Sequence, residues 1–159
     1  MFILGKEFED YFSELQTDLV AICLEFVDKK ADEIYIYGSY EPDAYYFNVF
    51  YNVQGTIVLK QKLNEIDVKN HDYIYDVSKE RQFALQRIGT EILEEIHKRC
   101  NEFNHEMPTE IKLRYSIKNN KLQAKYNYDL VYTNDDTLLP SNIFKTWFNE
   151  VSEELSKRD

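Results

Sequence analysis

The segment from Ile111 to Leu130 constrains the fold most, because apolar and polar residues alternate there on both sides of a short turn. The apolar residues before the turn are Ile111, Leu113, Tyr115 and Ile117. Those after it are Leu122, Ala124, Tyr126, Tyr128 and Leu130. Such alternation is typical of a β-strand with one face on a core, and Asn119-Asn120 tolerates the positive φ of a tight turn. The sequence therefore predicts a hairpin of two antiparallel strands.

A second group of strands is predicted earlier in the chain, where aromatic and β-branched residues are dense. The predicted strands are 34–37, 45–53 and 56–59. Residues 38–43 and the pair Gln54-Gly55 have the composition of turns, so the three strands form a meander. The stretch 61–78 has no clear period and is predicted to be a connection.

Three segments have the period of a helix with one apolar face. They run from about Lys6 to Lys29, from about Lys79 to Asn104, and from Ser141 towards the C-terminus. Ser141 is predicted to be the N-cap of the last helix, because a serine hydroxyl accepts a hydrogen bond from a free backbone N–H. Pro108 follows the second helix and prevents its continuation.

The order of these elements is α-β-β-β-α-β-β-α, and short hairpin connections dominate it. This order predicts an α+β fold in which an antiparallel five-stranded sheet has its helices packed on one face. A chain of 159 residues has the length of one domain, so we expect residues 1–159 to form a single unit.

Charge and glycine content argue against several classes of function. The chain has 19 Lys and Arg against 29 Asp and Glu, a net charge of −10, which repels nucleic acid. With 4 glycines it has no glycine-rich phosphate loop and no nucleophile elbow. It shows no membrane span or signal peptide, so we expect a cytoplasmic protein without a membrane partner. Cys23 and Cys100 lie outside metal or redox spacings and are expected to be buried thiols.

Two patterns in the sequence are compatible with metal-dependent chemistry. Glu94, His97, Cys100 and His105 make the best cluster of ligand-type residues, but a carboxylate bundle would need a second Glu-x-x-His helix, which the sequence lacks. The Asp43 and Asp67-Val68-Lys69 pair matches a short pattern found in metal-dependent nucleases. Because the cluster lacks that second helix and the nuclease pattern is short and common, we expect neither a metal nor a cofactor.

One further pattern is a basic stripe in the predicted hairpin. It consists of Lys112, Arg114, Lys118 and Lys125. Beside tyrosines it could contact nucleic acid, but alternating lysines on the solvent side of strands also protect a sheet edge.

Charge asymmetry and tyrosine content favour a protein partner. Residues 1–50 hold 11 acidic and 3 basic residues, a local net charge of −8, and the whole chain has 13 tyrosines. Tyrosine supplies a large contact area with a polar tip, and an acidic surface suits a basic partner. A purely structural role for these tyrosines, packing the sheet against helices, is equally compatible with the pattern.

The residues from Glu33 to Tyr51, with Tyr37-Gly38-Ser39-Tyr40 at their centre, and Lys62-Leu63-Asn64 after the Gln54-Gly55 turn, resemble the YezG-type antitoxin family of Firmicutes. The resemblance is densest over 33–64, and the order of elements is similar over nearly the whole chain. It implies a cytoplasmic immunity protein that binds a secreted toxin of the type VII route, often a nuclease, and blocks it.

We therefore expect a non-enzymatic immunity protein, a monomer or homodimer when free, whose partner is a cognate toxin. The predicted partner-binding residues are exposed acids or tyrosines in turns at sheet ends, where loops carry recognition. They are Tyr40, Glu41, Asp43, Asp135 and Asp136. Two alternatives stay open: a metal-dependent nuclease-like enzyme, and a cytoplasmic adaptor whose protein partner is not a toxin.

Overall fold

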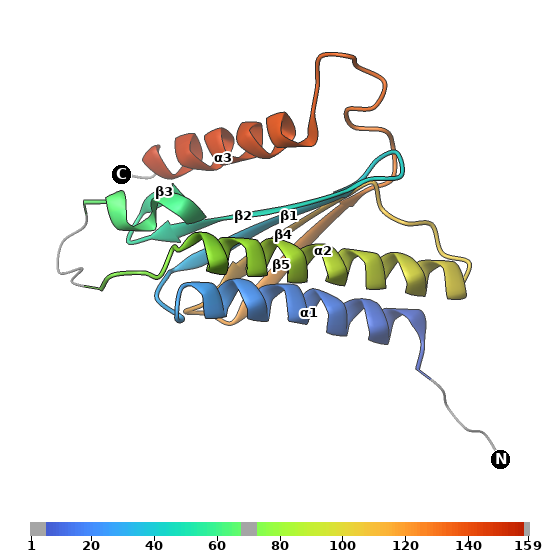
Figure 1. Ribbon diagram of the computed structural model, residues 1–159, viewed down its shortest axis with the longest axis horizontal. Coiled ribbons are helices and arrows are strands. Elements are labelled where there is room, and N and C mark those ends of the chain that lie inside the picture. The colour runs from blue at the N-terminus through green and yellow to red at the C-terminus, as the bar shows by residue number, and fades with distance from the viewer. Residues whose placement is uncertain (1–5, 68–72, 158–159) are drawn as a thin grey trace.

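The computed structural model describes residues 6–67 and 73–157 (Figure 1). It has three α-helices, five strands and a short 3₁₀ helix among these residues. In chain order they are α1 (Phe8–Phe26), β1 (Glu33–Tyr40), β2 (Tyr45–Val53), β3 (Thr56–Leu59), η1 (Lys60–Glu65), α2 (Lys79–Glu102), β4 (Glu110–Ser116), β5 (Lys121–Asn127) and α3 (Pro140–Ser156).

The strands form one antiparallel sheet in the order β3-β2-β1-β4-β5. Both predicted groups of strands are present, and they join where β1 pairs with β4. The α+β class, the five antiparallel strands and the order of the predicted elements are therefore confirmed. The structure adds η1 in the stretch for which the sequence predicted only a connection.

The helices α1 and α2 cover one face of the sheet and enclose the larger core. Gly89 of α2 lies against β2 so closely that a Cβ atom there would come within 2.5 Å of the Phe47 ring. Both cysteines belong to this core: Cys23 on α1 and Cys100 on α2 are fully buried and unpaired, and burial raises the pKa of each thiol.

The helix α3 covers the opposite face of the sheet, so the prediction that the helices pack on one face is wrong for this helix (Figure 1). The physical reason lies in β1 and β2, whose Tyr35, Tyr37 and Phe50 project away from α1 and α2 and are fully buried. Six successive residues of β1 are buried, which requires cover on both faces. Rings of α3 supply that cover: Phe144, Trp147 and Phe148 lie edge-on to Phe50, with centroids 5.1–5.6 Å apart.

The prediction that Ser141 caps this helix is also wrong, by two residues. The N-cap is Leu139, and Pro140 is the first helical residue, where its missing N–H costs nothing. The Asn142 side chain accepts a hydrogen bond from the backbone N–H of Leu139 at 2.8 Å and so takes part in starting the helix.

The outer strand β5 is much less covered than the rest of the sheet. Its first six residues, Lys121–Tyr126, are exposed, and the predicted core residues Leu122 and Tyr126 retain 38% and 39% of their exposure. The expectation that this strand contributes a core face is therefore corrected. None of the helices within 6–67 and 73–157 has the length and hydropathy required to cross a membrane.

Candidate functional site

Two segments that lie far apart in the sequence meet at one end of the sheet. One is the end of β1, Tyr40, with the β1–β2 turn that holds Glu41 and Asp43, and the other is the 129–139 segment that leads to α3. Glu41 connects them, because its Oε1 accepts hydrogen bonds from three successive backbone N–H groups. The donors are Val131 at 2.8 Å, Tyr132 at 3.1 Å and Thr133 at 3.0 Å. We call this region the turn–loop end.

Glu41 is buried, with 3% of its surface exposed, and the expectation that it is an exposed acid is wrong. Burial by itself raises the pKa of its carboxyl, but the hydrogen bonds from Thr133, Val131 and Tyr132 outweigh burial, and the pKa is lowered. The carboxylate therefore stays ionised and holds the loop. Its second oxygen, Oε2, has no hydrogen-bond partner within the described part of the chain.

Tyr132 strengthens the same connection from the loop side. Its buried hydroxyl donates to the Glu41 carbonyl and lies 3.1 Å from the Ser39 hydroxyl of β1. A buried tyrosine that bonds the turn backbone fixes the loop more firmly than a hydrophobic contact would, because its hydroxyl is directional.

Of the other four predicted residues, Asp43, Asp135 and Asp136 are exposed, whereas Tyr40 is half-buried. Asp43 has a positive φ of 54°, is exposed, and accepts a hydrogen bond from the Tyr40 hydroxyl at 3.2 Å. The Tyr40 ring also lies 4.3 Å from the His97 ring of α2. Asp135 and Asp136 are exposed, and Asp135 accepts from the Thr137 backbone N–H at 2.8 Å, so one acid of the pair is held in a local turn.

Acidic side chains also dominate α1. This helix contains five acids, Glu9, Asp10, Glu14, Asp18 and Glu25, and no Lys or Arg. All five are exposed. Among the residues that the structure describes, only Glu14 of these five forms an ion pair, with Lys6 at 2.8 Å. The outer side of this helix is therefore a field of largely uncompensated negative charge.

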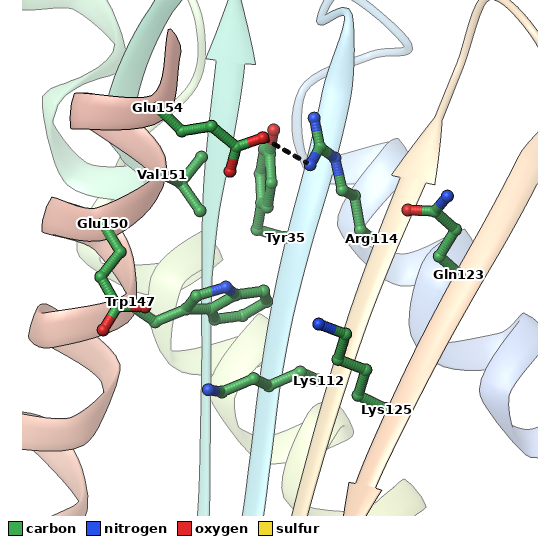
Figure 2. A pocket seen from close by; sticks show the side chains of 9 residues that line it. All are labelled: Tyr35, Lys112, Arg114, Gln123, Lys125, Trp147, Glu150, Val151 and Glu154. Carbon is green, nitrogen blue, oxygen red and sulfur yellow. Dashed lines mark ion pairs between the residues drawn. The ribbon is translucent and has the colours of Figure 1, made fainter. Parts of the chain in front are cut away.

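A groove of opposite character runs between α3 and β4–β5, because α3 leaves that part of the sheet open. It encloses about 240 Å³ and is shown in Figure 2. Lys112 and Arg114 of β4 and Lys125 of β5 lie on its floor, while Trp147 and Glu154 form the α3 wall. We call this region the basic groove.

Most charges of the basic groove are already engaged. The Arg114 Nε donates to Glu33 at 2.9 Å, and its guanidinium lies 3.8 Å from Glu154. The hydrogen bond with Glu33 raises the pKa of Arg114, which stays charged. Lys112 lies 5.5 Å from the Trp147 ring centroid and 3.9 Å from Glu110. Lys125 has no ion pair with any other described residue.

The metal-dependent constellations are not brought together in the structure. Within 6–67 and 73–157 no three His, Cys, Asp or Glu side chains gather in a metal-binding arrangement. His97 Nδ1 lies 2.7 Å from the Tyr45 hydroxyl, and His105 stacks on Phe8. Asp43 lies in the β1–β2 turn, whereas Asp67 follows η1 at the other end of the sheet, and Lys69 lies outside the described residues.

Sequence reasoning missed Tyr132 and Trp147, the residues that organise the two regions. Neither had a clear signal in the sequence: Tyr132 follows Leu130 and Val131 just beyond the predicted hairpin, and Trp147 lies in the predicted last helix, whose packing partner the sequence did not identify. Comparison of the sequence with protein-family models and with curated proteins found no match. The likeness to the YezG-type family therefore remains a prediction from the quoted residues.

Proposed function

We propose that this chain is a non-enzymatic cytoplasmic immunity protein that binds a cognate toxin domain through the turn–loop end. The observation that carries the proposal is the hydrogen bonding of Glu41 to three backbone N–H groups of the 131–133 loop. It fixes two acidic surface segments, at Asp43 and at Asp135 and Asp136, relative to one another before any partner arrives. A preorganised surface loses less entropy on binding, and this supports a recognition role.

The electrostatics also support the proposal. The exposed acids of α1 give the molecule a negative surface that attracts a basic toxin, including one whose own site binds nucleic acid. Such attraction speeds association and weakens as salt is added. We therefore expect the association rate constant to decrease as the salt concentration is raised from low to physiological.

The first experiment identifies the partner. The tagged protein is purified from its own cells, and the chain that copurifies is identified by mass spectrometry and expressed alone. We expect a chain that is toxic alone and harmless when coexpressed with this protein. A harmless partner would favour the adaptor alternative, and magnesium-dependent cleavage by the purified protein would favour the enzyme alternative.

The second experiment tests the surface. Asp135→Lys combined with Asp136→Lys is compared with Glu65→Lys combined with Asp67→Lys, which makes the same charge change at the other end of the sheet, also on exposed residues. We expect the first pair to lose protection against the toxin and the control pair to retain it. Equal loss in both would assign the effect to net charge and contradict the turn–loop end as the binding surface.

A further inference from the structure

The open edge of the sheet at β5 carries an inference independent of the proposed function. The backbone N–H of Tyr40 donates to the Thr109 carbonyl, and that of Ile117 donates to the Asp32 carbonyl. Thr109 and Ile117 flank β4, and along an antiparallel strand the residues bond alternately to one neighbour and to the other. The odd-numbered residues of β4 therefore bond to β1, and the even-numbered ones bond to β5. Their partners in β5 are Lys121, Gln123, Lys125 and Asn127.

The backbone groups of the intervening β5 residues consequently point away from the sheet. These residues are Leu122, Ala124 and Tyr126. An unpaired row of N–H and C=O groups on an outer strand is a template for another strand. The opposite edge, β3, has only four residues, so β5 with seven is the longer edge among the described strands.

The two faces beside this edge differ in chemistry. On the α3 face, Lys121 and Lys125 of β5 are exposed, and Lys125 borders the basic groove (Figure 2). On the α1 face, exposed Leu122 and Tyr126 alternate with them. Leu122 also borders a hollow of about 290 Å³ whose other walls are mainly apolar residues of α1, among them Val20, Ala21 and Leu24.

From this arrangement we propose that β5 binds, by antiparallel strand addition, an extended segment of another protein in which acidic and apolar residues alternate. Residues directly opposite one another in a sheet lie on the same face. The acidic side chains of the added strand therefore meet Lys121 and Lys125, and its apolar side chains cover Leu122, Tyr126 and the hollow beside α1.

The charges favour this partner over a second copy of the chain. Antiparallel pairing of two β5 strands would collect Lys121 and Lys125 of both copies on one face, and like charges across a sheet are destabilising. The same lysines that disfavour self-pairing attract a strand carrying Asp or Glu. The lysines of an edge strand thus select a partner as well as prevent aggregation.

The test uses capped seven-residue peptides, the length of β5, in which Glu and Val alternate. Binding to the full chain is followed by the fluorescence of Trp147, the single tryptophan, and by the anisotropy of labelled peptide. We expect binding of the Glu/Val peptide and about tenfold weaker binding of a Lys/Val peptide. Equal affinities would overturn the proposal.

Backbone methylation tests the hydrogen bonding itself. The apolar residues of the peptide lie opposite Leu122, Ala124 and Tyr126, so their N–H groups face β5 and the N–H groups of the Glu residues face outward. N-methylation of every Val should abolish binding, whereas N-methylation of every Glu should leave it. The reverse result, or an equal effect of both, would contradict antiparallel addition.

Two protein variants complete the test. Lys121→Glu with Lys125→Glu should weaken the Glu/Val peptide about tenfold and improve the Lys/Val peptide. Lys145→Glu with Lys157→Glu, the same charge change on an exposed residue of α3 and on its exposed C-cap, should leave both affinities unchanged. Circular dichroism verifies that each variant folds. If an oligothymidine displaces the peptide with a similar affinity, the lysines form a nucleic-acid site and the proposal is overturned.

Discussion

The centre and the outer edge of the sheet differ in almost every physical respect. In β1, six successive residues are buried between two helical layers, whereas in β5 six successive residues are exposed. The centre is rich in rings, with Tyr35 and Phe50 stacked at 4.6 Å, while the edge alternates lysine or glutamine with single apolar residues. The difference arises because α3 covers β1 and β2 but leaves β4 and β5 open on the same face of the sheet. The edge strand β5 keeps its outer backbone groups and its lysines available for binding.

The largest difference should appear when the same residue is truncated in neighbouring strands. Leu113 of β4 is fully buried, and Leu122 of β5 projects from the same face of the sheet with 38% exposure. Leu113→Ala should cost about 3 kcal/mol of unfolding free energy, because it leaves a cavity. Leu122→Ala should cost less than about 1 kcal/mol. Urea unfolding measures both, and equal losses would abolish the distinction between centre and edge.

Adding volume should give a smaller contrast of the same kind. Gly89→Ala places a methyl group against the Phe47 ring and should destabilise the protein by about 2 kcal/mol. The double variant Gly89→Ala/Phe47→Leu should recover part of the loss attributable to the clash, as a double-mutant cycle would show. On the exposed edge, Ala124→Val should change stability by less than about 0.5 kcal/mol. A neutral Gly89→Ala would contradict the tight approach of α2 to β2.

At the turn–loop end, a buried and an exposed acid can be compared directly. Glu41→Ala removes the acceptor of three backbone N–H groups and should cost about 2 kcal/mol. Asp136→Ala, at an exposed loop position, should be neutral within about 0.5 kcal/mol. Faster hydrogen exchange at the backbone N–H of residues 131–133 in Glu41→Ala would locate the effect. Unchanged exchange there would show that Glu41 does not hold the loop.

The smallest expected effect concerns pH. Burial opposes ionisation of Glu33 and Glu41, but hydrogen bonds to each carboxylate outweigh it, and both pKa values are lowered. A lowered folded pKa gives stability that is complete above the unfolded value of about 4.3 and is lost as pH falls through the folded value. Between pH 5 and pH 3, roughly spanning that value, the wild type should lose more stability than Glu33→Gln/Glu41→Gln. Parallel curves from denaturant titrations would contradict the assignment.

Local pattern predicted the elements of this fold better than it predicted their layers. Alternation in 111–130 located the β4–β5 hairpin, and α2 begins at Lys79, as expected. The side on which α3 packs depends on rings of β1 and β2 that face away from α1 and α2. Period alone does not distinguish a strand covered on one face from a strand covered on both.

The candidate site was predicted in position but not in the roles of its residues. Turn composition at 40–43 and acids at 135–136 marked two loops, and three of the five named residues are exposed. The burial of Glu41 could not be foreseen, because it depends on backbone N–H groups some ninety positions away in the chain. The basic groove could not be predicted, because it depends on which strands α3 covers, and only the packed structure shows this.

The two buried cysteines can report when the α1–α2 layer opens. Cys23 and Cys100 both lie beneath the sheet on the α1–α2 side, protonated and inaccessible, and α3 contains no cysteine. Because only an exposed thiolate reacts with an alkylating reagent, modification must wait until α1 or α2 separates from the sheet. Detachment of α3 alone leaves both thiols covered. The alkylation rate therefore depends on opening of the α1–α2 layer and not on opening of the α3 layer.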